Sequence, residues 1–305
     1  MRAVVVAISG AVAAIAFLLF AGGSSSAPAI TPPPKAVTRA AAPACTPMTP
    51  GTHRLPSLDG RIPVVLHVGS GVKPGRPLVV ALPGAGQFAR DFAKYTGYSK
   101  LADRKAFSVA YPTATGSRPF WNISGTQPGK PDDVAYLREV IAQAVQASCA
   151  DPARVSVTGV SNGGGMAARM ACEAADLLAA AAPVAGGYKS LPDCHPSRPV
   201  AVLEIHGAID HVVPYDGDET GAGSVPAFLK QWRRLDGCHG GATRSKPRGN
   251  VVELRWSHCA NGTAVEHDRI IDADHSWPGY DDVDGITGFA STRRTWSFLA
   301  RYRRN

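Results

Sequence analysis

The chain has 305 residues, of which 45% are hydrophobic, and a formal net charge of +8. This length and hydrophobic content are typical of a globular protein with a large buried core, and they exclude an intrinsically disordered chain. The positive charge could indicate nucleic acid or another anionic partner, but no nucleic-acid-binding motif accompanies it. Much of the excess lies on a predicted amphipathic helix at the C-terminus, where a solvated face is the simpler interpretation, and we expect no nucleic-acid partner. The arginines concerned are Arg293, Arg294, Arg301, Arg303 and Arg304.

The N-terminus has the pattern of a secretory signal. Arg2 precedes an apolar run over residues 3–21, and small residues follow it over residues 22–27. We therefore expect residues 1–27 to be a signal peptide of an exported protein. Residues 28–44 are rich in Ala, Pro, Ser and Thr and are predicted to be a linker, so that residues 45–305 form one folded domain. The apolar run just reaches transmembrane length, which leaves an uncleaved membrane anchor as the alternative.

The six cysteines form an even set, which indicates disulfide bonds in an exported chain. Proximity in the chain favours pairing Cys172 with Cys194 and Cys238 with Cys259, which leaves Cys45 with Cys149. No C-x-x-C pair stands beside histidines at the spacing of zinc ligands. We therefore expect disulfides and no structural metal.

After residue 45 the hydrophobic pattern alternates between short apolar strands and amphipathic helices. This alternation is typical of an α/β fold, with a mostly parallel central sheet and helices on both faces. Ligands of such sheets bind at the carboxyl ends of the strands, so residues that directly follow a strand are candidates for chemistry. The predicted strands span residues 61–68, 77–82, 107–111, 154–158, 179–184, 200–205, 251–256 and 265–271. Helices are predicted over residues 91–104, 132–148, 166–175 and 224–235 and at the C-terminus.

The segment Gly159 to Gly163 reads Gly-Val-Ser-Asn-Gly and lies between a predicted strand and a predicted helix. In that context the pattern G-x-S-x-G is typical of the nucleophile elbow of the α/β-hydrolase fold. Small residues two before and two after the serine let the backbone turn sharply and expose the hydroxyl. Ser161 is therefore the candidate nucleophile, and an ordinary surface turn is the alternative.

A glycine-rich loop over residues 83–87 follows the predicted buried strand 77–82. In the α/β-hydrolase fold this loop supplies one backbone N–H group of the oxyanion hole, and the residue after the nucleophile supplies the other. We expect Ala85 and Asn162 to be these donors and Gln87 to be a polar substrate contact. A plain strand-to-helix turn is the alternative.

The candidate acid and base follow later strands, in the chain order Ser, Asp, His that this fold uses. Asp210 comes after the strand at residues 200–205, where it could orient a histidine and stabilise its charged form. Other acids on this loop are Asp216, Asp218 and Glu219, and the pattern alone leaves them open.

His275 is the candidate base, because it follows the strand at residues 265–271 and opens a loop that contains Trp277. His239 and His258 adjoin cysteines, and His267 lies within the strand, so these histidines are weaker candidates. A metal site built from His206, Asp210 and His211 is a further alternative, but its spacing is not a standard ligand pattern. We expect no metal and no cofactor.

Several motifs together resemble the secreted esterases that include polyhydroxybutyrate depolymerases and bacterial feruloyl esterases, over most of residues 50–300. The resemblance implies Ser161 as nucleophile, Asp210 as acid and His275 as base, and it decides between the acids. Members usually carry a histidine where this chain has Pro83, which affects the oxyanion loop. The matching segments are residues 157–164 with 171–173, 182–186, 205–207 with 210 and 213–215, and 275–279.

The resemblance implies a serine esterase without a cofactor, acting on a polyester, a feruloylated polysaccharide or a small ester. We expect Trp121 and Trp277 to line the substrate pocket, with plain packing as the alternative. We also expect a monomer that contacts a membrane only if its N-terminal segment stays uncleaved. A serine peptidase or another acyl-transfer enzyme on the same fold is the main rival, and a non-catalytic polymer-binding protein is the second.

Overall fold

The computed structural model of the chain describes residues 45–125, 128–220, 223–245, 249–279 and 289–304. The predicted signal peptide and linker lie outside these residues. None of the helices described is both long and apolar enough to cross a membrane.

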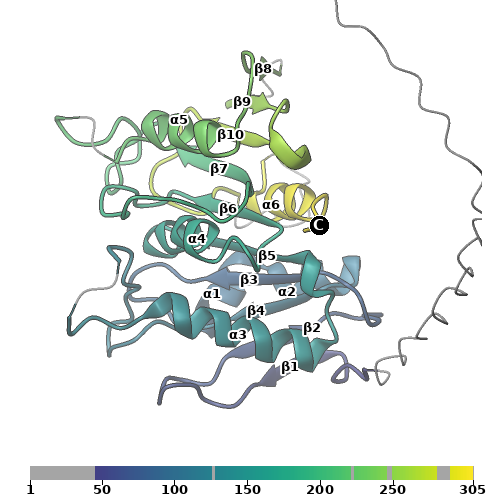
Figure 1. The fold of residues 1–305 in the computed structure, drawn as a ribbon. Helices are drawn as coiled ribbons and strands as arrows, with labels where there is room; N and C mark the ends of the chain where they lie inside the picture. The colour runs from purple at the N-terminus through teal and green to yellow at the C-terminus, as the bar shows by residue number, and fades with distance from the viewer. Residues whose placement is uncertain (1–44, 126–127, 221–222, 246–248, 280–288, 305) are drawn as a thin grey trace, which may run out of the picture. The chain divides into compact units, whose positions relative to one another are not determined.

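A ten-stranded sheet runs through the described domain in the order β1-β2-β4-β3-β5-β6-β7-β10-β9-β8 (Figure 1). Neighbouring strands are parallel from β4 to β10, and the strands at both edges are antiparallel. The expected mostly parallel α/β sheet is thus confirmed. The strands are β1 (Gly51–Arg54), β2 (Val65–Val68), β3 (Leu78–Leu82), β4 (Ser108–Tyr111), β5 (Val155–Val160), β6 (Ala180–Val184), β7 (Ala201–Gly207), β8 (Thr243–Arg244), β9 (Val251–Trp256) and β10 (Val265–Ile270).

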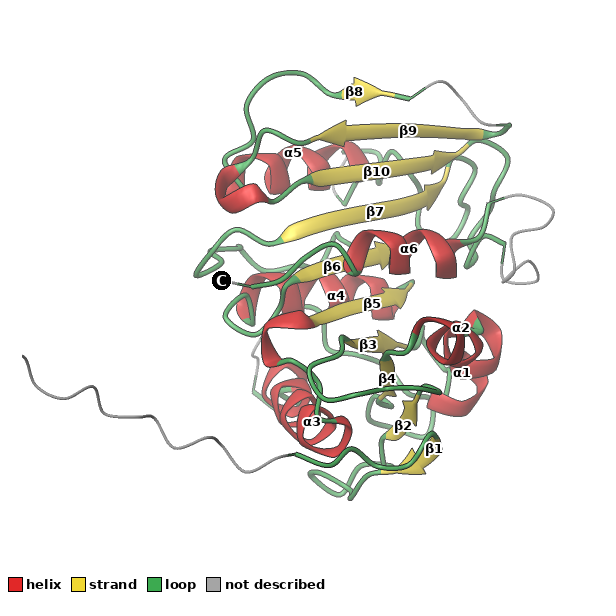
Figure 2. Ribbon diagram, turned by 90° about the vertical axis from the view of Figure 1, so that its right-hand side faces the viewer, coloured by secondary structure: helices red, strands yellow, loops and turns green. Residues whose placement is uncertain are grey.

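Helices cover both faces of the sheet, with α3, α4 and α5 on one face and α1, α2 and α6 on the other (Figure 2). Each set packs on its own hydrophobic cluster. The helices are α1 (Ala89–Thr96), α2 (Tyr98–Lys105), α3 (Asp133–Ser148), α4 (Asn162–Glu173), α5 (Val225–Leu235) and α6 (Ser291–Leu299), with short 3₁₀ turns at Pro152–Arg154 and Ala260–Gly262.

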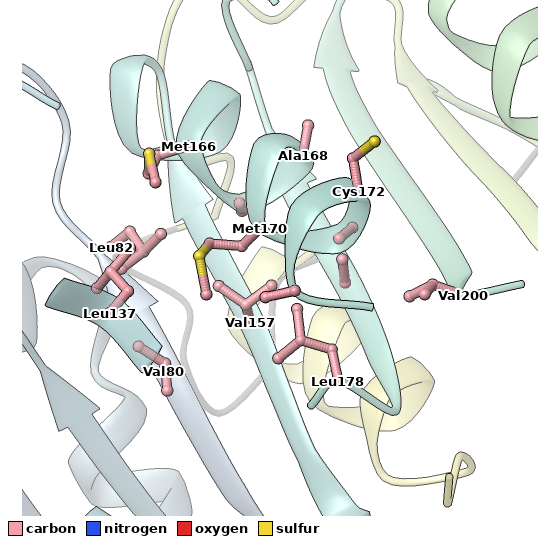
Figure 3. Close-up of a cluster of buried hydrophobic side chains, with 14 of the residues drawn as sticks. Val80, Leu82, Leu137, Val157, Met166, Ala168, Met170, Cys172, Leu178 and Val200 are labelled. Carbon is pink, nitrogen blue, oxygen red and sulfur yellow. The ribbon is translucent and has the colours of Figure 1, made fainter. Parts of the chain in front are cut away.

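The central strands are buried on both faces because their side chains alternate between the two clusters. In β3, Val80 and Leu82 face the cluster under α3 and α4, whereas Val79 and Ala81 face the other cluster. Figure 3 shows Met166 and Met170 of α4 packed in the first cluster with Val80 and Leu82. Each fully buried aliphatic side chain of this kind contributes roughly 1.5–3 kcal/mol. This packing holds α4, and therefore the turn that leads into it, firmly on the sheet.

Several elements differ from the sequence prediction: β1 was not among the predicted strands, and the strand predicted over residues 61–68 begins only at Val65. The predicted helix over residues 91–104 is two helices, because Gly97 between them adopts a left-handed conformation with φ of 63°. Glycine takes this conformation without a steric penalty, so it ends α1 although the apolar pattern continues. The short strand β8 was not predicted, since both of its residues are exposed and give no hydrophobic signal.

Three disulfide bonds join the pairs that proximity in the chain favours. Cys45–Cys149 ties the first described residue to the end of α3, and Cys172–Cys194 ties α4 to the segment after β6. The third bond is Cys238–Cys259, and the six cysteines leave no free thiol. Cross-links of this kind stabilise a fold chiefly by restricting the unfolded chain.

Candidate active site

Ser161, Asp210 and His275 each follow a strand of the sheet, and the carboxyl ends of these strands lie on the same side of the domain. Ser161 comes directly after β5, Asp210 follows β7, and His275 follows β10. The strands β5, β6, β7 and β10 are consecutive neighbours and all parallel, so their carboxyl ends lie side by side (Figure 1). The topology thus gathers three polar side chains that are far apart in the sequence.

Ser161 occupies a strained turn between β5 and α4. Its φ of 57° and ψ of −123° lie outside the common regions for a residue with a side chain. A Cβ atom at Gly159 would lie 2.4 Å from the carbonyl oxygen of Gly163, and one at Gly163 would lie 2.2 Å from that of Leu82. Side chains at both flanking positions are therefore excluded by contact with backbone. This is the physical reason for glycine on either side of the half-buried Ser161.

The two backbone groups expected to form an oxyanion hole are both available. Within the described residues, no intramolecular hydrogen bond engages the N–H of Ala85, which is exposed, or that of Asn162, which opens α4. The loop that carries Ala85 is fixed from two sides: Gly86 N–H donates to Pro119 O over 2.7 Å, and Gly84 N–H donates to Gln87 Oε1 over 2.9 Å. Gln87 was expected to contact substrate, but its side chain closes the loop on itself.

The side chain of Asn162 locks the elbow to a neighbouring loop. Its Oδ1 accepts from Trp121 N–H over 2.7 Å, and its Nδ2 donates to Trp121 O over 3.0 Å. The indole of Trp121 donates to Pro83 O over 2.9 Å, and the residue is only 1% exposed. Trp121 was expected to line the substrate pocket, and the structure instead buries it as a brace between the elbow and the oxyanion loop.

Trp277 is also interior, although it was expected at the pocket. It is fully buried, packs edge-to-face on Phe92 with 6.0 Å between ring centroids, and donates its indole N–H to Thr292 Oγ1 over 2.9 Å. The plain-packing alternative therefore describes this tryptophan. The sequence could not reveal this, because the residues that bury it lie in α1 and α6.

Asp210 and His275 form a direct pair. His275 Nδ1 lies 2.8 Å from Asp210 Oδ2, and Asp210 Oδ1 accepts from the N–H groups of Val212 (2.9 Å) and Val213 (2.7 Å). Burial opposes ionisation of Asp210, but hydrogen bonds from His206, His275 and the backbone lower its pKa well below the usual range. An ionised carboxylate only accepts hydrogen bonds, so Nδ1 of His275 carries the hydrogen.

The alternative acids do not reach His275 in the described structure. Asp216 and Glu219 are exposed on the loop after β7, and Asp218 pairs with Lys189 at 2.7 Å. The geometry therefore favours the same acid that the resemblance selected.

The alternative bases are also separated from Ser161. His239 and His258 are exposed near a disulfide, and the ring of His267 is buried, 2.9 Å from the hydroxyl of Tyr215. His275 is therefore the histidine that pairs with the candidate acid. Ser161 and His275 both follow the carboxyl ends of parallel strands, and no hydrogen bond joins the Ser161 hydroxyl to the imidazole.

The suggested metal set does not converge. His211 is exposed and pairs with Asp274 at 3.2 Å, whereas His206 is buried beside Asp210. Within the described ranges, no group of three or more His, Cys, Asp or Glu side chains is arranged to hold a metal ion.

A cavity of about 330 Å³ adjoins the site and was not predicted. Its walls include Ile123, Gly187, Val212 and Val213. Gly187 N–H donates to Ser161 O over 3.3 Å, and Val213 N–H donates to Asp210, so two of the wall residues are direct neighbours of the site residues. The apolar residues after Asp210 are visible in the sequence. That they line a cavity could not be predicted, because the opposite wall comes from the loop after β6.

Comparison with known proteins also points to ester hydrolysis. The sequence profile described as "Esterase PHB depolymerase" matches residues 64–191. "Putative esterase NocK" of Nocardia uniformis subsp. tsuyamanensis is 33% identical over 277 residues, which cover 84% of this chain and 76% of that protein.

Two further relatives are matched over shorter segments. "Feruloyl esterase B" of Piromyces equi is 34% identical over 48% of this chain, and "Poly(3-hydroxyalkanoate) depolymerase C" of Paucimonas lemoignei is 34% identical over 43%. The aligned segments span only 29% and 33% of those two proteins.

Among solved structures, "Acetyl xylan esterase from Aspergillus awamori" superposes with a TM-score of 0.58 over 73% of this chain and 92% of its own, at 18% sequence identity. At that identity the likeness concerns the α/β-hydrolase fold. With a relative matched along most of both chains, the protein is a carboxylic ester hydrolase that belongs to the Esterase PHB depolymerase family.

Proposed function

We propose that the protein is a secreted serine esterase in which Ser161, Asp210 and His275 form the catalytic triad. The observation that carries this proposal is the 2.8 Å contact between His275 Nδ1 and the buried, ionised Asp210, at the end of the parallel strands where the strained Ser161 follows β5. A histidine held in this way presents Nε2 as the free base. The strained turn keeps the serine hydroxyl outside the helix that follows.

In the proposed reaction, Ser161 Oγ attacks the ester carbonyl while His275 Nε2 takes its proton. The negative charge that develops on the carbonyl oxygen is held by the N–H groups of Asn162 and Ala85. His275 then gives the proton to the departing alkoxide, which leaves an acyl group on Ser161. Water, activated by the same imidazole, releases the acid and restores the serine. These steps need neither a metal nor a cofactor.

The surroundings of the site favour an acyl group that is largely apolar. Apolar side chains line part of the cavity beside Ser161, and four exposed ones flank the loops that carry the site residues. The names of the relatives include a feruloyl esterase and a poly(3-hydroxyalkanoate) depolymerase, so aromatic esters and aliphatic polyesters are both proposed classes. The exposed residues are Phe88, Phe120, Ile209 and Val212.

Labelling and substrate preference test this proposal together. We expect a fluorophosphonate probe to modify the peptide that contains Ser161, and a p-nitrophenyl ester to be cleaved much faster than a peptide p-nitroanilide. Methyl ferulate, an acetylated sugar and hydroxybutyrate oligomers should then be compared by kcat/KM. Preferred cleavage of the anilide would favour a peptidase. Absence of both labelling and ester hydrolysis would favour a non-catalytic polymer-binding protein.

Secretion is part of the same proposal and rests on the signal pattern and the three disulfides, which persist in oxidising compartments. We expect N-terminal sequencing of exported protein to begin between about residues 22 and 45, because small residues after the apolar run form the cleavage region. Protein that keeps Met1 and sediments with membranes would instead show an uncleaved anchor.

A further inference from the structure

A second histidine, which the proposed triad does not use, contacts the same Asp210 oxygen as His275. His206 Nε2 is 3.2 Å from Asp210 Oδ2 and 2.9 Å from Val213 O, and its Nδ1 is 2.8 Å from Glu204 Oε1. The side chains of Glu204, His206 and Asp210 have no exposed surface. Since both ring nitrogens face oxygen acceptors, both must donate, and the ring is an imidazolium.

Other polar groups also contact Glu204. Tyr188 OH donates to Glu204 Oε1 over 3.0 Å, and His267 Nδ1 lies 2.7 Å from Glu204 Oε2. The far nitrogen of His267 is 2.9 Å from Tyr215 OH, and the Arg269 guanidinium lies 4.4 Å from the centre of the Tyr215 ring. These groups come from β7, β10 and the loops after β6 and β7, and His275 is bonded to Asp210 on the same network.

The contacts determine the charges of Glu204, His206 and Asp210. Burial would lower the pKa of His206, but the Glu204 carboxylate and the bond to Asp210 raise it to about 10. Burial would raise the pKa of Glu204, but the charge of His206 lowers it to about 2. At neutral pH the side chains of Glu204 and Asp210 are therefore negatively charged, and the side chain of His206 is positively charged.

We propose that His206, kept charged by Glu204, is a positioning residue that holds Asp210 and balances part of its negative charge. A carboxylate without this balance would bind the proton on His275 more tightly. The balanced carboxylate orients His275 through their 2.8 Å contact and attracts its proton less strongly. This inference rests on the proposed function, because it gives Asp210 and His275 the roles assigned there.

The acid limb of the kcat/KM profile tests the inference. In His206→Gln we expect the midpoint of this limb to move to higher pH by about one unit, the effect of removing a nearby unit charge at an effective dielectric constant of about 20. The double variant Glu204→Gln/His206→Gln should move it in the same direction by less. The double variant also removes the more distant negative charge of Glu204, so that no Glu204 carboxylate is left buried without a charged partner.

The control is His211→Gln, which removes the exposed pair of His211 and Asp274 on the same loop, because the His211 side chain forms its ion pair with Asp274 and not with Asp210. Its acid limb should coincide with that of the unaltered enzyme. Looser packing alone would lower the rate at every pH and leave the midpoint in place. Fluorophosphonate titration gives the fraction of folded, reactive enzyme in each preparation.

A measurement on the unaltered protein decides the matter even if both variants fail to fold. In ¹⁵N-histidine NMR at pH 8, the ring of His206 should carry hydrogens on both nitrogens. A neutral ring, or an unmoved acid limb in folded His206→Gln that still hydrolyses esters, would overturn this inference alone. If the unaltered protein neither hydrolyses esters nor reacts with the probe, the proposed function itself is wrong.

Discussion

Replacing Ser161 by alanine is expected to lower kcat for a p-nitrophenyl ester by about 10⁴- to 10⁶-fold, to the level left by substrate binding and the oxyanion donors. The loss follows because no other hydroxyl occupies the turn between β5 and α4, and a Cβ atom cannot attack a carbonyl. Substrate binding should change little, since the cavity walls and the N–H groups of Ala85 and Asn162 stay in place. Steady-state rates, with circular dichroism to verify folding, measure this result.

Ser297→Ala is the matched control, because Ser297 is an exposed serine on α6 whose hydroxyl donates only to Arg294 O over 2.9 Å. It should keep full activity and full reactivity with a fluorophosphonate. If folded Ser161→Ala keeps more than about a tenth of kcat, far above what removal of a triad nucleophile leaves, the nucleophile is another group.

Asp210→Asn is expected to lower kcat by about 10⁴-fold, the order seen when a triad acid is amidated. The contacts of Asp210 say why. Its Oδ1 is held by the N–H groups of Val212 and Val213, so an asparagine would keep its oxygen there and turn its NH₂ toward His275. The amide would donate to Nδ1, and the hydrogen of the imidazole would move to Nε2, where the proton of Ser161 has to be accepted.

Asp216→Asn controls for a changed carboxylate on the same exposed loop and should behave like the unaltered enzyme. The two variants are compared by kcat, KM and thermal unfolding. A folded Asp210→Asn enzyme within tenfold of full activity would remove Asp210 from the triad and reopen the choice of acid.

The local hydrophobic pattern predicted the fold class well, because the fold class depends on which residues are buried. The strand that feeds the elbow, the helix after Asp132 and the strand at residues 251–256 were found from apolar runs and turn residues alone. The division of α1 from α2 was missed because Gly97 acts through its backbone conformation, which an apolar pattern does not record.

At the site, the order of Ser161, Asp210 and His275 along the chain could be predicted, whereas their surroundings could not. Gln87 was interpreted as a substrate contact from its place in the oxyanion loop, and Trp121 was expected at the pocket together with the family resemblance. Their hydrogen bonds point inward, and such partners depend on the packing of distant segments. The same holds for Glu204, which meets His267 only because β7 pairs with β10 in one particular register.

The disulfide bond between Cys172 and Cys194 makes one wall of the cavity dependent on oxidising conditions. The bridge closes a segment of 22 residues that contains β6 and the Gly187 wall of the cavity, and it fixes that segment to the far end of the helix that begins after Ser161. Before oxidation, this wall lacks its covalent tie to α4. The covalent tie of this cavity wall therefore forms only under oxidising conditions.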